Sequence, residues 1–285
     1  MNVLITGITG NFGYALYKLL VNRKELDIFA GSRHPERVNF LLDKPEVQVR
    51  RFDFYEPETY RSTVDGADTV VLVSPPDLSQ VRKHMFPFID ECRGSGVRHI
   101  LFLSLLGAER NRFLAHNMLE RYIISSGIDY TFLRSGFFME NLFTRHREEI
   151  RRLSRLVVPA GSGKTSFIAI QDVAAAGARC IDNPAHLNQA YELTGDASYS
   201  YDELAGMLSK ELGRRITYNS AGCLDFYRHR RKIGDPAASI AVMALIYRSV
   251  KNGGADRSTA DLHDVFGITP VDLPSFIRNN RDYFL

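Results

Sequence analysis

Short apolar runs alternate with helix-patterned segments through the first half of the chain. Runs with the length and β-branched content of strands cover residues 3–6, 28–33, 47–54, 69–74, 99–105 and 130–134. Residues 69–74 read TVVLVS, an unbroken apolar run typical of a strand buried on both faces. Apolar residues at helical spacing fill the intervals, as in 12–22, 80–94 and 114–126. This alternation predicts right-handed βαβ units and an α/β fold with a Rossmann-type, doubly wound parallel sheet.

The hydrophobic pattern changes after Gly136. Residues 140–156 are expected to form one charged helix, 156–170 an extended stretch and 172–181 a helix of small residues. The rest is mostly helical, with short strands over 189–194 and 216–218 and helices over 200–212, 224–232, 237–250, 258–266 and 274–284. We therefore expect a Rossmann domain over 1–182, of which 137–156 contribute to its neighbour, and a smaller, helix-rich lobe over 183–285.

The first predicted strand ends in a glycine-rich turn. Gly7, Gly10 and Gly13 follow this strand directly and precede an amphipathic helix, which is the setting of a dinucleotide-binding turn. Gly7 allows a sharp exit from the strand, Gly10 lacks the Cβ that would obstruct a pyrophosphate, and Gly13 allows close helix–sheet packing. The helix N-terminus then offers unpaired N–H groups to the phosphates. The residues expected to bind the cofactor here are Gly7, Thr9, Gly10, Asn11, Phe12 and Gly13.

The second predicted strand ends in Ser32 and Arg33, where a site for NAD(H) tends to have a carboxylate for the ribose hydroxyl. An arginine stands there instead of an acid, and Arg37 lies four residues further on. A planar guanidinium can pair with a 2′-phosphate through two parallel hydrogen bonds. The alternative is that Arg33 only covers the adenine ring. We expect NADP(H) to be preferred over NAD(H), with Ser32, Arg33 and Arg37 in the site.

Composition narrows the choice of partners. The formal net charge of +3 at pH 7 is too small to indicate a nucleic acid or a membrane as the partner. Cys92, Cys180 and Cys223 are far apart and include no CxxC pair, so neither a disulfide framework nor a metal site is expected. The N-terminus has no signal-peptide pattern, and the sequence has no run of about 18 apolar residues. A cytoplasmic location is expected.

Residues 161–166 read GSGKTS, which is superficially similar to a phosphate-binding P-loop. The P-loop pattern needs a glycine five positions before Gly163, where this chain has Val158. The segment also lacks the strand–loop–helix context at the right place. Hydrolysis of a nucleoside triphosphate is therefore not expected.

Five stretches taken together resemble the NmrA-like family of atypical short-chain dehydrogenase/reductases. They are TGITGNFG at 6–13, DGADTVVLVSPP at 65–76, GVRHILFLS at 96–104, SSGIDYTFLRSGFFMEN at 125–141 and PAGSGKTSFIAIQDVA at 159–174. Within the family, the chain is most similar to the bacterial NADPH-dependent quinone reductase and triphenylmethane reductase group. The resemblance implies a Rossmann domain, a small C-terminal domain and a nicotinamide cofactor.

The resemblance also adds cofactor contacts at other strand ends. It implies that Asp53 faces the adenine amino group, although Asp53 could instead only cap the following helix. The loop Ser74-Pro75-Pro76 would lie beside the ribose and the nicotinamide, at the carboxyl edge of the sheet. The further cofactor-binding residues that the resemblance implies are Phe54, Ser104, Gly136 and Phe137.

Most short-chain reductases carry a Tyr-x-x-x-Lys pair on the helix after the fifth strand. In this chain Glu120 matches the glutamate of that family pattern, so His116 stands at the lysine position and Arg112 at the tyrosine position. The catalytic pair is therefore absent. His116 becomes the candidate catalytic residue, which would bind the ribose or assist protonation because the unperturbed pKa of histidine is ~6.5. The alternative is a histidine on the solvent side of its helix.

We interpret the sequence as an NADPH-binding oxidoreductase that transfers hydride to a quinone or a similar conjugated acceptor, a reaction that needs no dedicated phenolic acid. Phe138 and Phe226 would wall the acceptor site on the side of the smaller lobe, or equally belong to the core. The alternative is a non-catalytic NADP(H) sensor that acts through a protein partner. A third alternative, modification of a sugar nucleotide, is disfavoured by the missing pair. Neither flavin nor metal is expected.

Overall fold

The computed structural model describes residues 1–38, 42, 47–75 and 80–285, so Pro76 lies outside the described residues. The chain forms two compact units. The N-terminal unit contains Met1–Ser135 and Ile170–Glu192, and the C-terminal unit contains Gly136–Ala169 and Leu193–Leu285. The expected limits left 157–169 in the Rossmann domain and put 183–192 in the smaller lobe, whereas Gly136–Ala169 belong to the C-terminal unit and the N-terminal unit extends to Glu192. The chain passes from one unit to the other three times.

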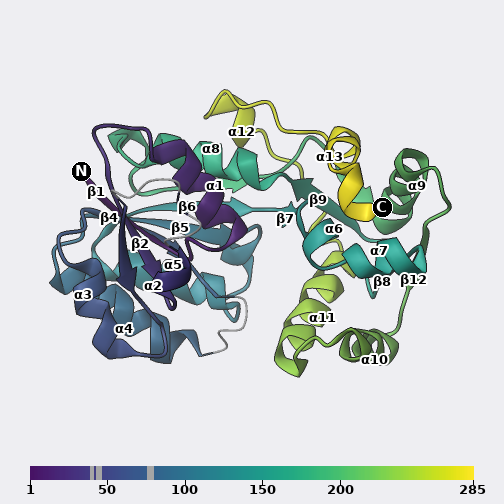
Figure 1. Cartoon of the computed structure of the whole chain (residues 1–285), viewed down its shortest axis with the longest axis horizontal. Helices are drawn as coiled ribbons and strands as arrows, with labels where there is room; N and C mark the ends of the chain where they lie inside the picture. Colours follow the sequence, from purple (N-terminus) through teal and green to yellow (C-terminus); the bar gives the residue numbers. More distant parts are fainter. Residues whose placement is uncertain (39–41, 43–46, 76–79) are drawn as a thin grey trace. The chain divides into compact units, whose positions relative to one another are not determined.

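A seven-stranded sheet forms the centre of the N-terminal unit (Figure 1). Its order is β10-β6-β5-β4-β1-β2-β3, and the six strands from β6 to β3 pair in parallel. The Asn188 N–H donates to Tyr130 O and the Gly136 N–H to Leu193 O, so β10 also runs in the direction of β6. The strands are β1 (Asn2–Thr6), β2 (Asp27–Ser32), β3 (Gln48–Arg51), β4 (Thr69–Val73), β5 (His99–Leu105), β6 (Asp129–Ser135) and β10 (Gln189–Leu193). The predicted Rossmann-type sheet is confirmed.

Helices cover both faces of this sheet. On one face α1 packs against α8, where a Cβ on Gly177 would lie 3.2 Å from Leu133 and 3.5 Å from Leu101. On the other face α3, α4 and α5 enclose a cluster in which the rings of Phe52, Phe54 and Phe88 lie within 5.5 Å of one another. The helices and 3₁₀ turns of the unit are α1 (Asn11–Leu20), α2 (Pro35–Val38), η1 (Pro57–Thr59), α3 (Tyr60–Val64), α4 (Val81–Gly94), η2 (Ala108–Arg110), α5 (Ala115–Ser126), α8 (Ile170–Cys180) and η3 (Pro184–His186).

The C-terminal unit has a mixed α/β composition. Its strands form two small sheets, β11-β9-β7 and β12-β8. They are β7 (Phe137–Phe138), β8 (Arg155–Val158), β9 (Lys164–Ile168), β11 (Ser198–Ser200) and β12 (Thr217–Ser220). Its helices are α6 (Asn141–Thr144), α7 (Arg147–Leu153), α9 (Tyr201–Leu212), α10 (Cys223–Ile233), α11 (Ala237–Lys251), α12 (Asp261–Asp264), α13 (Leu273–Asn279) and η4 (Arg281–Phe284). Lys164 begins a strand and not a helix, which agrees with the rejection of a P-loop.

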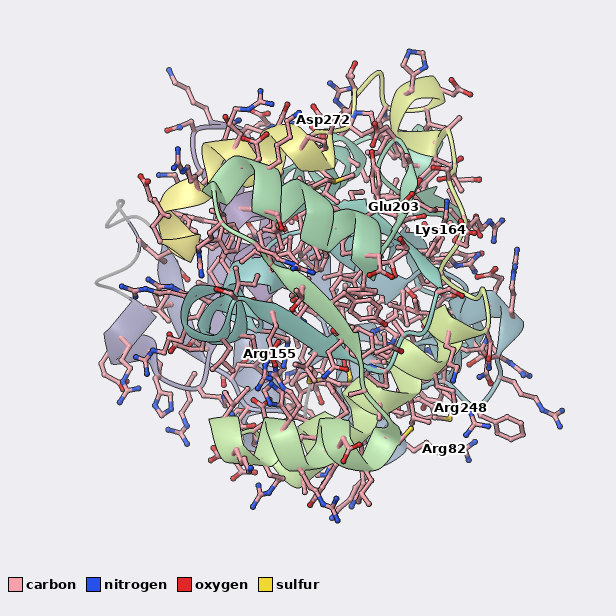
Figure 2. All side chains as sticks on the ribbon, turned by 90° about the vertical axis from the view of Figure 1, so that its right-hand side faces the viewer. Arg82, Arg155, Lys164, Glu203, Arg248 and Asp272 are labelled. Carbon is pink, nitrogen blue, oxygen red and sulfur yellow. The ribbon has the colours of Figure 1, made fainter. Side chains whose placement is uncertain are left out.

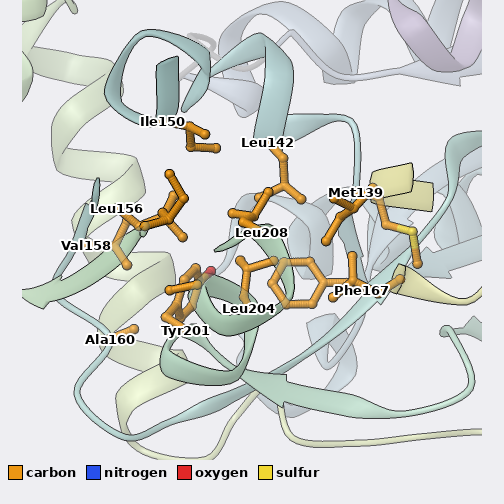
Figure 3. Close-up of a cluster of buried hydrophobic side chains, with 14 of the residues drawn as sticks. Met139, Leu142, Ile150, Leu156, Val158, Ala160, Phe167, Tyr201, Leu204 and Leu208 are labelled. Carbon is orange, nitrogen blue, oxygen red and sulfur yellow. The ribbon is translucent and has the colours of Figure 1, made fainter. Parts of the chain in front are cut away.

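The core of the C-terminal unit gathers residues from most of these elements. Figure 3 shows Phe167 of β9, Tyr201 and Leu204 of α9, and Leu156 of β8 in one apolar cluster. Helix α9 begins with a capping box, in which the Ser200 side chain accepts from the Glu203 N–H and the Glu203 carboxylate accepts from the Ser200 N–H. This hydrogen bond to the backbone lowers the pKa of Glu203, and the charge of Lys164 nearby adds to the effect (Figure 2).

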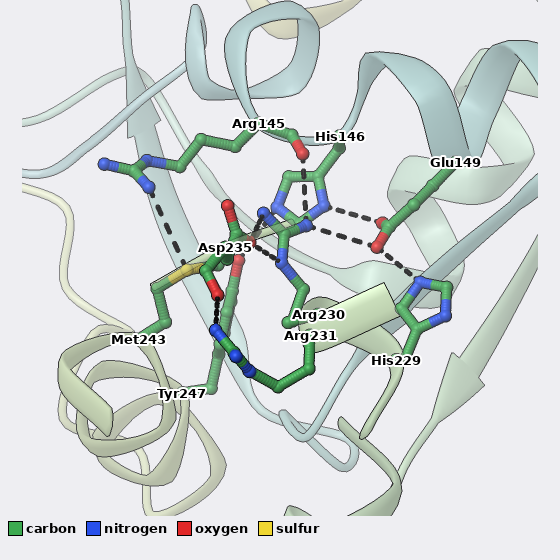
Figure 4. A network of polar contacts seen from close by, with 9 residues as sticks. All are labelled: Arg145, His146, Glu149, His229, Arg230, Arg231, Asp235, Met243 and Tyr247. Carbon is green, nitrogen blue, oxygen red and sulfur yellow. Dashed lines mark hydrogen bonds and ion pairs between the residues drawn. The ribbon is translucent and has the colours of Figure 1, made fainter. Parts of the chain in front are cut away.

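A buried polar network joins α7 to α10 (Figure 4). The Glu149 carboxylate is fully buried and accepts from His146 Nδ1 at 2.9 Å, His229 Nε2 at 2.7 Å and Arg230 at 3.2 Å. Arg230 is 1% exposed and also pairs with Asp235 at 2.5 Å. Burial acts to raise the pKa of Glu149, but the hydrogen bond from His146 and the charge of Arg230 lower it overall. The carboxylate is therefore held ionised inside the unit.

The prediction of a single helix over 140–156 is wrong, because the polar network around Glu149 interrupts this helix. Helix α6 ends at Thr144, and α7 begins only at Arg147. Between them His146 leaves helical geometry, with φ −109° and ψ 0°, and its ring lies between Glu149 and the Tyr247 hydroxyl at 2.9 Å. The long-range partner Tyr247 is absent from the local periodicity, so a break at His146 could not be seen in the sequence.

Two further helices are shorter than expected. The segment expected to be helical over 258–266 is helical only in α12, because the Thr259 N–H donates to Thr194 Oγ1 at 2.9 Å and holds the chain before it extended. The helix expected over 274–284 ends at Asn279. Beyond it Arg147 Nε donates to Tyr283 O at 3.0 Å, which binds the last turn to α7. No helix of the described residues is long and apolar enough to cross a membrane.

Candidate functional site

The predicted cofactor residues of the N-terminal unit lie at one edge of the sheet. The chain order reverses between β1 and β4, which are neighbours although β2 and β3 follow β1 in sequence. Ligands of doubly wound folds bind outside the carboxyl ends of the strands at such a point. The glycine turn follows β1 directly, and Val73 at the end of β4 lies 3.2 Å from the position of a Cβ on Gly7.

The glycine positions of the turn leave little room for a side chain. Gly7 has φ +67°, a left-handed conformation that favours glycine. The Gly10 N–H donates to Gly7 O at 2.8 Å and closes the turn. A Cβ on Gly13 would overlap Gly7 O and lie 3.0 Å from Ile8 Cα, both of which are backbone atoms. Gly13 is therefore required for the approach of α1 to the turn.

The N-terminus of α1 is open towards this edge. Its N-cap is Gly10, and neither a side-chain cap nor an acidic residue occupies its first turn. The first N–H groups and the helix dipole are thus available to an anion. Thr9, Gly10 and Asn11 are exposed, whereas the Phe12 ring is 3% exposed and belongs to the core. A contact from Phe12 to a cofactor would have to come from its backbone.

The second strand ends beside the turn, since β2 pairs with β1 in parallel. Ser32 is half-buried and its Oγ accepts from the His34 N–H at 3.1 Å. Arg33 and Arg37 are exposed, and neither forms an ion pair within the part of the chain that the structure describes. Two guanidinium groups are therefore free to take a phosphate here.

The third strand leads into a compact turn. One carboxylate oxygen of Asp53 accepts from the Tyr55 N–H at 2.9 Å, so Asp53 has a local structural role and a second oxygen to spare. Phe54 is 5% exposed and packs edge-on to Phe88, which places its ring in the core. Tyr55 is exposed, and its ring lies 4.7 Å from that of His84 on α4. Tyr55 and His84 could not be picked out from the sequence, since Tyr55 follows β3, His84 lies on α4 and no motif joins them.

The fourth and fifth strands end in a polar region. Ser74 and Pro75 are half-buried directly after β4. Ser104 near the end of β5 is 3% exposed, and its hydroxyl donates to Glu120 at 2.5 Å. Glu120 on α5 is also paired with Arg134 of β6 at 2.7 Å. This buried ion pair holds α5 against the sheet. The Ser104 hydroxyl takes part in it, because it donates its hydrogen to Glu120.

His116 lies one turn before Glu120 on α5. It is half-buried, and its ring stacks on Phe102 of β5 with centroids 5.8 Å apart. Burial lowers the pKa of His116, and the charge of Glu120 opposes this only in part. The side chain thus faces the sheet more than the solvent, and the imidazole is neutral at pH 7.

The other predicted residues belong to the C-terminal unit. A Cβ on Gly136 would lie 2.6 Å from Ser166 O, so the backbone of β9 approaches it closely. Phe137 and Phe138 are half-buried and form β7, which pairs with β9. Phe226 has no exposed surface, and its ring lies 5.7 Å from that of Tyr247. The Phe226 ring is therefore inaccessible to a substrate, which does not support the substrate role expected for it.

Comparison with known proteins accounts for this geometry. Residues 7–184 match the NAD(P)H-binding family, and the chain belongs to that family. Quinone oxidoreductase 2 of Escherichia coli is 28% identical over 281 residues, which cover 97% of this chain and 98% of that protein. NAD(P)H azoreductase of Xenophilus azovorans is 33% identical over 224 residues, which cover 76% of each chain. Both of these relatives are oxidoreductases by name.

Solved structures agree with the sequence relatives. The NADPH-dependent quinone oxidoreductase of Escherichia coli, complexed with NADPH, has a TM-score of 0.87 at 25% identity and covers 98% of this chain and 99% of that chain. Triphenylmethane reductase of Citrobacter sp. has a TM-score of 0.86 at 23% identity over the same shares, and it shares the fold. The expected resemblance to this group and the expected binding of NAD(P)H are confirmed.

Proposed function

We propose that the protein is an NADPH-dependent reductase that passes a hydride to a quinone or a related conjugated acceptor. The observation that carries the proposal is the open N-terminus of α1 behind the Gly7–Gly13 turn, at the point where the strand order reverses. Gly13 lets α1 approach the turn closely, since a Cβ there would overlap backbone, and the first N–H groups of α1 would then bind a pyrophosphate. The reactions named for the relatives, reduction of quinones and azo compounds, support the acceptor class.

The main task of the protein in this reaction is to position the cofactor and the acceptor for hydride transfer. A bound reduced nicotinamide supplies a hydride, and a quinone that takes up this hydride and one proton becomes a hydroquinone. His116 is neutral at pH 7, so its proposed role is a hydrogen bond to the ribose, with the proton drawn from solvent. The Glu120–Arg134 pair keeps α5, and with it His116, in place. The cofactor contact expected of Phe137 and the acceptor contact expected of Phe138 remain predictions; both side chains are half-buried in β7.

Arg33 is the proposed determinant of NADPH preference. The Arg33→Ala variant should bind NADPH about 10–100-fold more weakly, the worth of a charge-assisted pair, and should bind NADH unchanged. Isothermal titration with both reduced cofactors measures this. Arg61→Ala removes an exposed arginine that pairs with Glu91, and should change neither affinity. Tighter binding of NADH by the wild type, or equal losses for both cofactors, would contradict the proposal.

Oxidation of NADPH in the presence of a quinone panel tests the reaction itself. We expect quinone-dependent loss of the reduced-nicotinamide absorbance, well above the rate without protein. If NADPH binds but no quinone is reduced, the reductase proposal fails and a sensor becomes the better reading, which the missing Tyr-x-x-x-Lys pair favours. In that case a protein partner should bind with an affinity that differs between NADP⁺ and NADPH. If NADPH does not bind, the proposal of a cofactor site at the glycine turn is wrong.

A further inference from the structure

The loop between β5 and α5, residues 106–114, lies at the carboxyl edge of the N-terminal sheet (Figure 1). The proposed cofactor site has the pyrophosphate at the glycine turn after β1 and the adenosine at Arg33 after β2. Strands β4 and β5 lie on the other side of β1. A dinucleotide that spans this edge must therefore extend its nicotinamide half over the ends of β4 and β5, next to this loop.

Hydrogen bonds of the backbone hold the loop and set the place of Phe113. The Leu106 N–H donates to Ser135 O at 2.9 Å, which binds the start of the loop to the end of β6. Asn111 Oδ1 accepts from the Phe113 N–H at 3.0 Å, and Asn111 O accepts from the Leu114 N–H at 3.0 Å. The position of Phe113 thus depends on Asn111 and not on packing of the Phe113 ring.

The Phe113 ring itself lies in water. It is 78% exposed, the largest exposed fraction among the large apolar side chains of the described residues. Within the described part of the chain it contacts no other aromatic ring. Removal of such a ring from water by a flat ligand is favourable, and two aromatic rings gain further from offset or edge-to-face contact. Phe113 therefore offers a stacking surface beside the expected nicotinamide position.

Arg112 adds a positive charge to this surface. It is exposed, and its guanidinium carbon lies 5.1 Å from the centre of the Phe113 ring. The neighbouring Arg110 is paired with Glu109 at 3.2 Å, and Arg134 lies 3.6 Å from the same carboxylate group. Arg112 has no ion pair among the residues that the structure describes, so its planar fork of N–H donors can bind an acidic group.

We propose that Phe113 and Arg112 bind the hydride acceptor, and that the preferred acceptors are quinones that carry a sulfonate or carboxylate group. The quinone ring stacks on Phe113 while Arg112 pairs with the acidic group, which is unchanged by the reaction. The quinone takes up the hydride of NADPH and one proton and leaves as the hydroquinone. This inference rests on the proposed reductase function, because it names the substrate class of that same site.

A binding experiment without turnover tests the Arg112–Phe113 pair. Naphthalene-2-sulfonate has a flat ring and an acidic group but cannot accept a hydride, and 2-naphthol is its uncharged counterpart. Isothermal titration of the full-length protein saturated with NADP⁺ should show tighter binding of the sulfonate. Arg112→Gln should weaken sulfonate binding about tenfold, the worth of an exposed charge-assisted pair, and leave 2-naphthol binding unchanged. Phe113→Ala should weaken both ligands about 3–10-fold, whereas Phe113→Tyr should retain the wild-type affinity.

Steady-state kinetics with a matched pair of quinones tests the substrate class. 1,4-Naphthoquinone-2-sulfonate and 1,4-naphthoquinone differ only in the acidic group. Arg112→Gln should raise the KM for the sulfonated quinone about tenfold, with kcat, the KM for 1,4-naphthoquinone and the KM for NADPH unchanged. The matched control Arg110→Gln removes an arginine of the same loop that is already paired with Glu109, and should change none of these values.

Three results would overturn the inference. In the first, Arg112→Gln weakens the sulfonate and its uncharged counterpart equally. In the second, Arg110→Gln causes the same loss as Arg112→Gln, which indicates only the general charge of the loop. In the third, Phe113→Ala binds both ligands like the wild type. Failure of the reductase proposal has a different signature: naphthalene-2-sulfonate binds as expected, but the wild type reduces neither quinone. The pair is then a site for aromatic acids, and its assignment to a hydride acceptor is wrong.

Discussion

A Gly13→Ala variant is expected to lose NADPH affinity by about 100-fold or more, since pyrophosphate binding depends on one tight backbone geometry. The added Cβ would overlap Gly7 O and press on Ile8 Cα. Backbone atoms cannot rotate away as a long side chain can, so α1 must move off the turn. The unpaired N–H groups of α1 then no longer converge on one phosphate position. Titration of NADPH measures the loss, and thermal unfolding reports the accompanying destabilisation of about 1–3 kcal/mol.

Two other glycines make the comparison specific. At Gly10 a Cβ would lie 3.1 Å from Gly7 O, so Gly10→Ala should destabilise the fold less than Gly13→Ala, although its Cβ would still obstruct a pyrophosphate and weaken NADPH binding. Gly206 lies on the exposed side of α9 with no atom within 4 Å of its Cβ position. Gly206→Ala should leave binding unchanged and stabilise the protein by about 0.5–1 kcal/mol through helix propensity. Wild-type affinity in Gly13→Ala would refute the proposed phosphate site.

Replacing Glu149 with alanine is expected to lower the free energy of unfolding by about 3–5 kcal/mol, the range for breaking a buried ion pair on one side. The carboxylate accepts from His146, His229 and Arg230 and is fully buried. Its removal leaves two imidazole N–H groups without their acceptor and Arg230 with less compensation in a dry environment. Urea unfolding followed by circular dichroism measures the change.

The adjacent residue supplies the control. Glu148 is exposed and forms a surface pair with Arg152 at 2.7 Å, so Glu148→Ala should cost less than about 0.5 kcal/mol. A loss in Glu149→Ala no greater than this would show that the network contributes no stability. The folded-state pKa of Glu149 is lowered, so its contribution is present above the ordinary value of 4.5 and is lost as pH falls below it. The stability difference between wild type and Glu149→Gln should therefore narrow in acid.

The strands β1 to β6 were predictable because each is a local run between punctuating residues. Strand β10 was expected in the smaller lobe, and only its pairing with β6 places it in the sheet of the N-terminal unit. The bounds of β5 agree with the prediction over 99–105, and those of the other strands differ by a few residues at their ends. Helix α2 was not predicted, and a helix after Asp53 was expected only as part of the alternative role of that residue, since Pro35–Val38 and Tyr60–Val64 are too short to show a period. In the C-terminal unit, β7 and β11 are held by β9, a partner distant in sequence, and carry no pattern of their own.

In the candidate site, too, features set by local sequence could be predicted, and features set by distant contacts could not. The glycine turn could be predicted because three glycines within seven residues perform one local task. The stacking of His116 on Phe102 and the use of the Ser104 hydroxyl by Glu120 depend on the docking of α5 on β5.

The three passages of the chain between the units have a consequence for biosynthesis. A ribosome delivers residues 136–169, which belong to the C-terminal unit, before β10 is available to complete the edge of the N-terminal sheet. Strand β9 can pair with β11, and Arg147 of α7 can donate to Tyr283 O, only after residues 193–285 have been synthesised. Contacts so distant in sequence close large loops and form slowly. A nascent chain halted near residue 182 should therefore expose unfinished edges of both units, and cutting the gene there should yield two fragments that fold only when they are made together.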